Sequence, residues 1–198
     1  MKTKAREAIY ILDVGGLIMK TIGIVVGSLR KGAFSQSVAN YVATQAPEGF
    51  EFKFIEIGQL PLYNQDFDAE SPGVYSAFRE EIKSLDAVLF VTPEHNRSFP
   101  AALKNALDVG SRPYGSNVWN DKPAAVISVS PGAISGFGAY HHLKQVLGFL
   151  NVYVLPQPEA YLGSIMESLD EAGNVNNDSL KGFLKDFVGA FVKWIEKF

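Results

Sequence analysis

Hydrophobic residues along the chain fall into two patterns that alternate from one end to the other. Short apolar runs rich in β-branched residues indicate buried strands, and one run of alternating polar and apolar residues indicates an edge strand. Between these runs, apolar residues recur every three or four positions, as they do on one face of a helix. Buried strands are expected at 21–26, 87–92, 124–130 and 152–155, the edge strand at 51–57, and helices at 35–46, from 72, from 100, at 140–150 and from 178.

Residues that favour helix ends mark where several of these helices begin. Ser35 is the predicted N-cap of the first helix, and Pro47 ends that helix. Ser71 followed by Pro72 predicts an N-cap with proline in the first helical position. Asp178 is the predicted cap of the last helix. These helices therefore have a start signal in addition to their apolar pattern.

The alternation of strands and helices predicts an α/β fold, in which helices cover both faces of a parallel sheet. Right-handed crossovers leave few topologies for such a sheet. The pattern fits a flavodoxin-like three-layer sandwich with a five-stranded parallel sheet in the order 2-1-3-4-5. A single domain is expected over residues 19–198, and residues 1–18 are expected to be an N-terminal extension.

The N-terminal extension resembles a signal peptide in one respect only. Basic residues at Lys2, Lys4 and Arg6 precede an apolar run, but Asp13 interrupts that run and no clear cleavage site follows. Met19 directly precedes the first strand and is the expected functional start of the chain.

Composition excludes several classes of function. The 198 residues carry 18 basic and 21 acidic side chains, a net charge of −3, with no basic cluster of the kind that binds nucleic acid. No segment has the run of about 18 apolar residues that a membrane span needs. With no cysteine, the chain has neither disulfides nor thiolate chemistry, which fits a reducing compartment and a cytoplasmic location.

Ligands of such sheets bind beyond the carboxyl ends of the strands, so the loop after the first strand is the first candidate site. Gly27 and Gly32 allow tight turns there, while Ser28, Arg30 and Ser35 offer polar groups beside the start of a helix. The loop lacks the Walker A pattern and the GxGxxG pattern of dinucleotide sites. It is therefore suited to a monophosphate, although an ordinary βα turn has the same composition.

Two further loops reach the same edge of the sheet. The loop 93–100 is bracketed by prolines, and its backbone groups could meet a planar, hydrogen-bonding ring. The loop 130–138 is rich in small residues, which allow a flat ligand to approach the backbone. Each could equally be a plain connection, the first from a strand to a helix and the second a flexible turn.

Taken together, these loops resemble the NADPH-dependent FMN reductase family, and among its members the bacterial chromate and quinone reductases. The resemblance rests on the GSLRKG segment at 27–32 with Ser35, and on the PEHNRSFP segment at 93–100 followed by LKNALD at 103–108. It extends from Lys20 to the C-terminal helix and leaves out residues 1–18.

The resemblance implies bound FMN, reduction by NADPH or NADH, a small acceptor such as a quinone, and homodimers that can pair into tetramers. It places the phosphate at the loop of Gly27, Ser28, Arg30, Ser35 and Gln36, and the isoalloxazine ring against Pro93, Glu94, His95 and Asn96, flanked by Ser130 to Gly132. The family usually has Asn in place of Gln36 and commonly Tyr in place of His95. The second change leaves the role of that side chain open, because imidazole titrates near neutral pH.

A flavodoxin-type electron carrier that serves protein partners is the alternative function. Such carriers are often strongly acidic, whereas −3 over 198 residues makes a weak field. The aromatic loop 60–67 also suits a covered pocket or an interface better than an open flavin edge. An enzyme is therefore favoured. Neither a metal site nor a Ser/His/Asp triad is expected from the three histidines, His95, His141 and His142.

Overall fold

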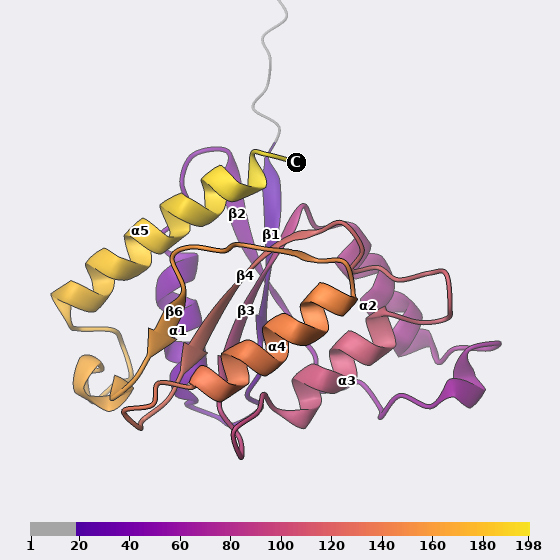
Figure 1. Ribbon diagram of the computed structural model, residues 1–198, viewed down its shortest axis with the longest axis horizontal. Coiled ribbons are helices and arrows are strands. Elements are labelled where there is room, and N and C mark those ends of the chain that lie inside the picture. Colours follow the sequence, from indigo (N-terminus) through magenta and orange to yellow (C-terminus); the bar gives the residue numbers. More distant parts are fainter. Residues whose placement is uncertain (1–18) are drawn as a thin grey trace, which may run out of the picture.

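Parallel strands form one sheet in the computed structural model, which describes residues 19–198 (Figure 1). The strands are β1 (Lys20–Val26), β2 (Phe50–Ile55), β3 (Ala87–Pro93), β4 (Pro123–Val129), β5 (Tyr153–Val154) and β6 (Ala160–Leu162). Their order is β2-β1-β3-β4-β5, and β6 also pairs with β4. The predicted parallel order is confirmed, with one strand more than expected. The predictions for the N-terminal extension lie outside the described residues.

Helices cover both faces of the sheet, as the three-layer sandwich requires (Figure 1). They are α1 (Phe34–Ala43), α2 (Gly73–Lys83), α3 (Ala101–Gly110), α4 (Phe137–Phe149) and α5 (Asp178–Ile195), with short 3₁₀ turns at Gln65–Phe67 and Ile165–Ser168. The apolar sides of α1 and α5 pack on one face, and those of α2, α3 and α4 on the other. None of the helices in residues 19–198 is long and apolar enough to cross a membrane.

The two-residue repeat of the buried strands divides the core into two halves. On β3, Val88 and Phe90 face the helices α2 to α4, whereas Leu89 and Val91 face α1 and α5. All four side chains are buried. Their continuous apolar run is typical of a parallel strand that is covered on both faces.

The expected last strand at 152–155 is divided in two in the structure. β5 pairs only with the first residues of β4, and after Leu155 the chain leaves the sheet. It returns at Ala160 so that β6 pairs with residues 127–129 of the same strand. With only three residues, β6 is too short to give a recognisable hydrophobic pattern.

Three predicted helix caps are wrong. Ala33, and not Ser35, is the N-cap of α1, which gains no side-chain cap. α2 begins at Gly73 after Pro72, so Ser71 lies outside it. The cap of α5 is Asn177, whose Oδ1 accepts the Leu180 N–H at 3.0 Å. At α5 the neighbouring Asn177 and Asp178 have similar capping preference, which makes the exact start ambiguous in sequence.

Replacing either of two helical glycines with alanine should change the free energy of unfolding, but in opposite directions. A Cβ on Gly110 would lie 2.3 Å from Nε1 of the buried Trp119, whereas a Cβ on Gly182 would meet nothing within 4 Å. We expect Gly110→Ala to lower the free energy of unfolding by about 1–3 kcal/mol through overpacking. Gly182→Ala should raise it by about 0.5–1 kcal/mol through helix propensity. Urea unfolding of the two variants checks this pair, and effects of the same sign would contradict it.

Candidate functional site

A cavity of about 520 Å³ opens where the carboxyl ends of β1, β3 and β4 meet, at the lower edge of the sheet in Figure 1. All three loops singled out in the sequence contribute to it. The lining residues are Gly27, Ser28, Leu29, Arg30, Ala33, Phe34, Ser35, Pro93, Glu94, His95, Pro100, Ala101, Ala102, Val129 and Pro131.

The loop after β1 brings hydrogen-bond donors to the start of α1. The first N–H groups of a helix have no partner within the helix, and here they belong to residues that line the cavity. Within residues 19–198, the buried Oγ of Ser35 has no hydrogen-bond partner. The Arg30 guanidinium lies over the Phe34 ring at 5.2 Å, exposed at the cavity mouth. This arrangement is suited to an anion with several oxygens.

The lack of a side chain at Gly27 favours the close approach of β1 to the neighbouring strand. The Gly27 N–H donates to the Val91 carbonyl at 2.9 Å, and a Cβ at this position would lie 3.1 Å from the Thr92 Oγ1. The loop therefore leaves the sheet directly beside the carboxyl end of β3, and the first two loops face the same cavity.

The loop after β3 is a tight two-residue hairpin, which we call the ring turn (residues 93–98). The N–H of His95 donates to the Ser98 carbonyl at 2.8 Å, and the Ser98 N–H donates back at 2.9 Å. Asn96 and Arg97 between them have φ of +51° and +65°, as in a type I′ turn. His95 thus uses both backbone groups inside the turn. The N–H groups of Asn96 and Arg97 have no partner within the part of the chain described.

The loop after β4 contributes backbone and small side chains. Ser130 Oγ accepts the Gly132 N–H at 3.1 Å, and Ser128 Oγ donates to the Ser135 carbonyl at 2.9 Å. These internal bonds fix the loop, and Pro131 is the residue that it presents to the cavity.

The structure brings seven of the eleven predicted site residues together around the cavity. They are Gly27, Ser28, Arg30, Ser35, Pro93, Glu94 and His95. Gln36 lines an adjacent hollow of about 440 Å³ together with Arg30, and its amide donates to Asn40 Oδ1 at 2.8 Å. Asn96, Ser130 and Gly132 shape their loops without lining the cavity.

Sequence reasoning missed the apolar part of the lining. Phe34 at the start of α1 and the first turn of α3, at Ala101 and Ala102, contribute apolar surface to it. The only signal for them is position: each directly follows a loop already selected, at the start of a helix. Trp119 and Tyr140 are buried in the core, and Tyr114 lies outside the cavity lining.

The histidines outside the ring turn belong to α4. Nδ1 of His142 lies 3.1 Å from Ser98 Oγ, and Nε2 of His141 lies 3.0 Å from the Tyr161 hydroxyl. Burial raises the pKa of Tyr161, which also donates to Glu159 at 2.7 Å. Residues 19–198 contain no group of three His, Cys, Asp or Glu that could hold a metal ion.

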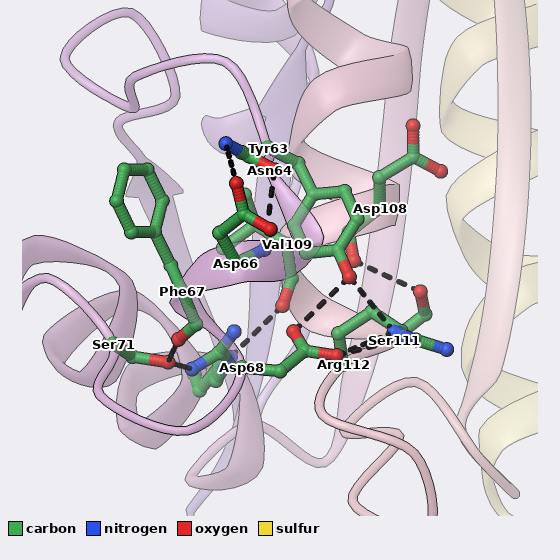
Figure 2. Close-up of polar contacts among 11 residues, drawn as sticks. Tyr63, Asn64, Asp66, Phe67, Asp68, Ser71, Asp108, Val109, Ser111 and Arg112 are labelled. Atoms are coloured by element: carbon green, nitrogen blue, oxygen red, sulfur yellow. Dashed lines mark hydrogen bonds and ion pairs between the residues drawn. The ribbon is translucent and has the colours of Figure 1, made fainter.

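A separate polar network fixes the long loop between β2 and α2 (Figure 2). Asp68 accepts the Tyr63 hydroxyl at 3.0 Å and pairs with Arg112 at 2.8 Å, and Arg112 Nε also donates to the Tyr63 oxygen at 2.9 Å. The hydrogen bond to Tyr63 is the main cause that raises the pKa of Arg112. None of these residues lines the cavity. The network therefore supports the loop rather than the site.

Comparison with known proteins assigns the fold and the site to a family. Residues 19–167 match the model of the NADPH-dependent FMN reductases. The chain belongs to this family. A quinone reductase of Pseudomonas putida is 51% identical over 177 residues, covering 89% of this chain and 95% of its own. A 2-hydroxy-1,4-benzoquinone reductase of Burkholderia is 42% identical over 174 residues, covering 88% and 95%.

A solved structure agrees with this assignment. The flavoenzyme NAD(P)H:(acceptor) oxidoreductase FerB of Paracoccus denitrificans matches with a TM-score of 0.84 and 41% identity. The match covers 90% of this chain and 98% of that protein. The flavodoxin-like fold expected from the sequence is therefore confirmed.

The cavity fits the FMN that the family name implies. Its volume of about 520 Å³ falls among ligand pockets, which span ~300–1,000 Å³. The buried Ser35 hydroxyl lacks a partner that an anionic oxygen at the start of α1 would supply. Beside it, the apolar wall of α3 and the prolines of the second and third loops suit a flat ring.

We expect Ser35→Ala to separate stability from ligand binding. Removing an unpartnered buried hydroxyl should raise the free energy of unfolding of the FMN-free protein by about 1 kcal/mol. The same change should weaken FMN binding by about 1.5–3 kcal/mol, because a hydrogen bond to a charged group is lost. Urea unfolding and fluorescence titration measure the two effects.

Ser37→Ala is the matched control, because Ser37 lies on the same helix outside this cavity. It should leave FMN affinity unchanged. Loss of stability in Ser35→Ala with unchanged FMN affinity would show that the hydroxyl is structural.

Proposed function

We propose that this protein is an FMN-containing reductase that takes electrons from NADPH or NADH and passes them to quinone-like or other small acceptors. The observation that carries the proposal is a cavity formed by three loops and lined by Ser35 at the start of α1, whose buried hydroxyl has no partner within residues 19–198. The names of the curated relatives, quinone reductase and 2-hydroxy-1,4-benzoquinone reductase, support the class of acceptor. Bound FMN would supply hydride acceptance and electron donation, which amino-acid side chains cannot.

Residues of the first loop hold the phosphate in this proposal. Ser28 and Ser35 supply hydroxyls, the start of α1 supplies N–H groups, and Arg30 supplies a charged fork at the rim. Gln36 faces the adjacent hollow and would act from the outer side of the same loop. The positive end of the helix dipole favours the phosphate charge further.

Residues of the other loops position the ring. Pro93 and Pro131 contribute rigid apolar surface to the cavity, and Asn96 and Arg97 shape the ring turn without lining the cavity. His95 lines the cavity, and both of its backbone groups are committed to the turn. Ser130 and Gly132 hold the third loop in place behind Pro131.

The cavity favours a ping-pong order of substrates. Its three loops leave one open site at the sheet edge, so nicotinamide and acceptor would use it in turn. Each would need to approach the ring at a near-attack distance of ~3–3.5 Å. The expected homodimer or homotetramer, the cytoplasmic location and activity on chromate stay predictions.

We expect Arg30→Ala to weaken FMN binding more than Lys31→Ala. Arg30 lines the cavity and can bind two phosphate oxygens, whereas Lys31 is exposed and faces only the adjacent hollow. The loss for Arg30→Ala should be about 1.5–3 kcal/mol, measured by fluorescence titration with FMN. Equal affinities of the two variants would refute the assignment of Arg30.

We expect the purified protein to bind one FMN per chain in preference to FAD, because its phosphate loop lacks the GxGxxG pattern of pyrophosphate sites. Chromatography of the flavin released by heat identifies it. Steady-state NADPH oxidation with varied quinone should then give parallel double-reciprocal lines. Release of FAD, or NADPH oxidation that no small acceptor accelerates, would contradict the proposed function.

A further inference from the structure

The side chain of Glu94, a residue that lines the cavity, reaches helix α4. Its Oε2 accepts the Ala139 N–H at 3.1 Å, and its Oε1 accepts from Nη1 of Arg97 at 3.2 Å. The Glu94 side chain is only 10% exposed. A nearly buried carboxylate that binds backbone 45 residues away joins two segments that the sequence separates.

Helix α4 needs such an acceptor, because its own sequence provides none. Its N-cap is Gly136, with φ of +73° and no side-chain cap. Ala139 lies in the first helical turn, where N–H groups lack intrahelical partners and the helix dipole favours a negative charge. Glu94 therefore caps α4 from the ring turn.

Two further contacts attach the ring turn to the same face of α4. A Cβ on Gly138 would lie 2.6 Å from the Arg97 carbonyl oxygen, so only glycine permits this approach of the backbones. One turn further along, Nδ1 of His142 lies 3.1 Å from Ser98 Oγ. Helix α4 thus meets the turn at its beginning, tip and end.

The turn requires such support because its backbone is unfavourable. Arg97, a residue with a full side chain, has φ of +65° and follows Asn96 at +51°. Consecutive left-handed residues persist only where surrounding structure fixes them. The Glu94 carboxylate supports this conformation through two contacts. It binds the guanidinium of Arg97 within the turn and the N–H of Ala139 on α4.

We propose that Glu94 is a positioning residue, which fixes the ring turn on α4 and thereby sets where Pro93 and His95 line the cavity that would hold the flavin. This inference rests on the proposed function, since it takes the ligand of the cavity to be FMN. The family resemblance implies only that Glu94 faces the ring, and the contacts with α4 give its side chain a separate role.

The test compares Glu94→Ala and Glu94→Gln with Glu80→Gln, a control on the exposed surface of α2 whose partner is Lys83. Hydrogen exchange in the FMN-free protein is measured first, on peptides that contain residues 93–99 and 137–142. Glu94→Ala should speed exchange in both peptides about tenfold, the loss expected for one hydrogen bond to a charged group. Glu94→Gln keeps an acceptor for Ala139 and should restore part of the protection.

FMN binding and the rate of flavin reduction by NADPH follow, at saturating FMN. Both Glu94 variants should lower the reduction rate in the order Ala below Gln below wild type, while Glu80→Gln matches wild type. Gly138→Ala should reproduce the slow reduction with Glu94 intact, because its Cβ displaces the Arg97 carbonyl. If Glu94→Ala does not fold, Glu94→Gln and Gly138→Ala decide the question.

The outcomes separate this inference from the proposed function. Wild type that binds no FMN contradicts the proposed function, whatever the variants do. Wild type that binds FMN, with unchanged hydrogen exchange and reduction rate in Glu94→Gln and Gly138→Ala, overturns the positioning role alone. Slow reduction with unchanged exchange in both peptides also overturns it, because Glu94 would then act on the ring directly.

Discussion

The parallel pairing of β1 with β3 is the constraint on which the site depends. From β1 the chain turns into α1 on one face of the sheet, and from β3 into α3 on the other. Loops that diverge to opposite faces leave a crevice between them, the usual ligand site of such sheets. Gly27, whose N–H continues the pairing with Val91, lets this divergence begin without a side chain in the way. The anion-binding start of α1 and the ring turn face each other for this reason.

Most of the architecture could be predicted from the sequence, because strands buried on both faces give unbroken apolar runs. The run at 87–92 is an example: its residues alternate between the two halves of the core. Short elements and the exact ends of helices and strands could not be predicted from the sequence. β6 has three residues, and its place is set by pairing with β4. The N-cap of α5 is Asn177 and not the predicted Asp178. These adjacent residues have the same capping chemistry, so local geometry alone selects one of them.

Site residues could be predicted where their position depends only on the loop that contains them. They could not be predicted where a contact with a residue distant in the sequence fixes the side chain. Ser28 and Arg30 line the cavity because they belong to the loop after β1, which could be recognised in the sequence. The orientation of Glu94, by contrast, depends on Ala139, and no pattern near residue 94 reports it. Ser35 shows a third case: it was predicted both to cap the helix and to bind a phosphate, and the cap prediction was wrong. The N-cap lies two residues earlier, at Ala33, so the Ser35 hydroxyl does not cap the helix and has no partner within residues 19–198.

Two buried side-chain polar atoms within residues 19–198 have no hydrogen-bond partner, and the two cases differ. At Arg79, Nη2 is unpartnered, but Nε donates to the Val109 carbonyl at 2.9 Å and Nη1 to Ser71 at 2.8 Å. Burial lowers the pKa of Arg79, and the Tyr75 ring lies 5.5 Å from the guanidinium carbon. Its remaining bonds and this ring compensate for the loss, and it holds the loop before α2. The Ser35 hydroxyl has no such compensation within residues 19–198. An unpaired group is costly unless something outside the fold satisfies it, and Ser35 opens onto the cavity where a ligand can do so.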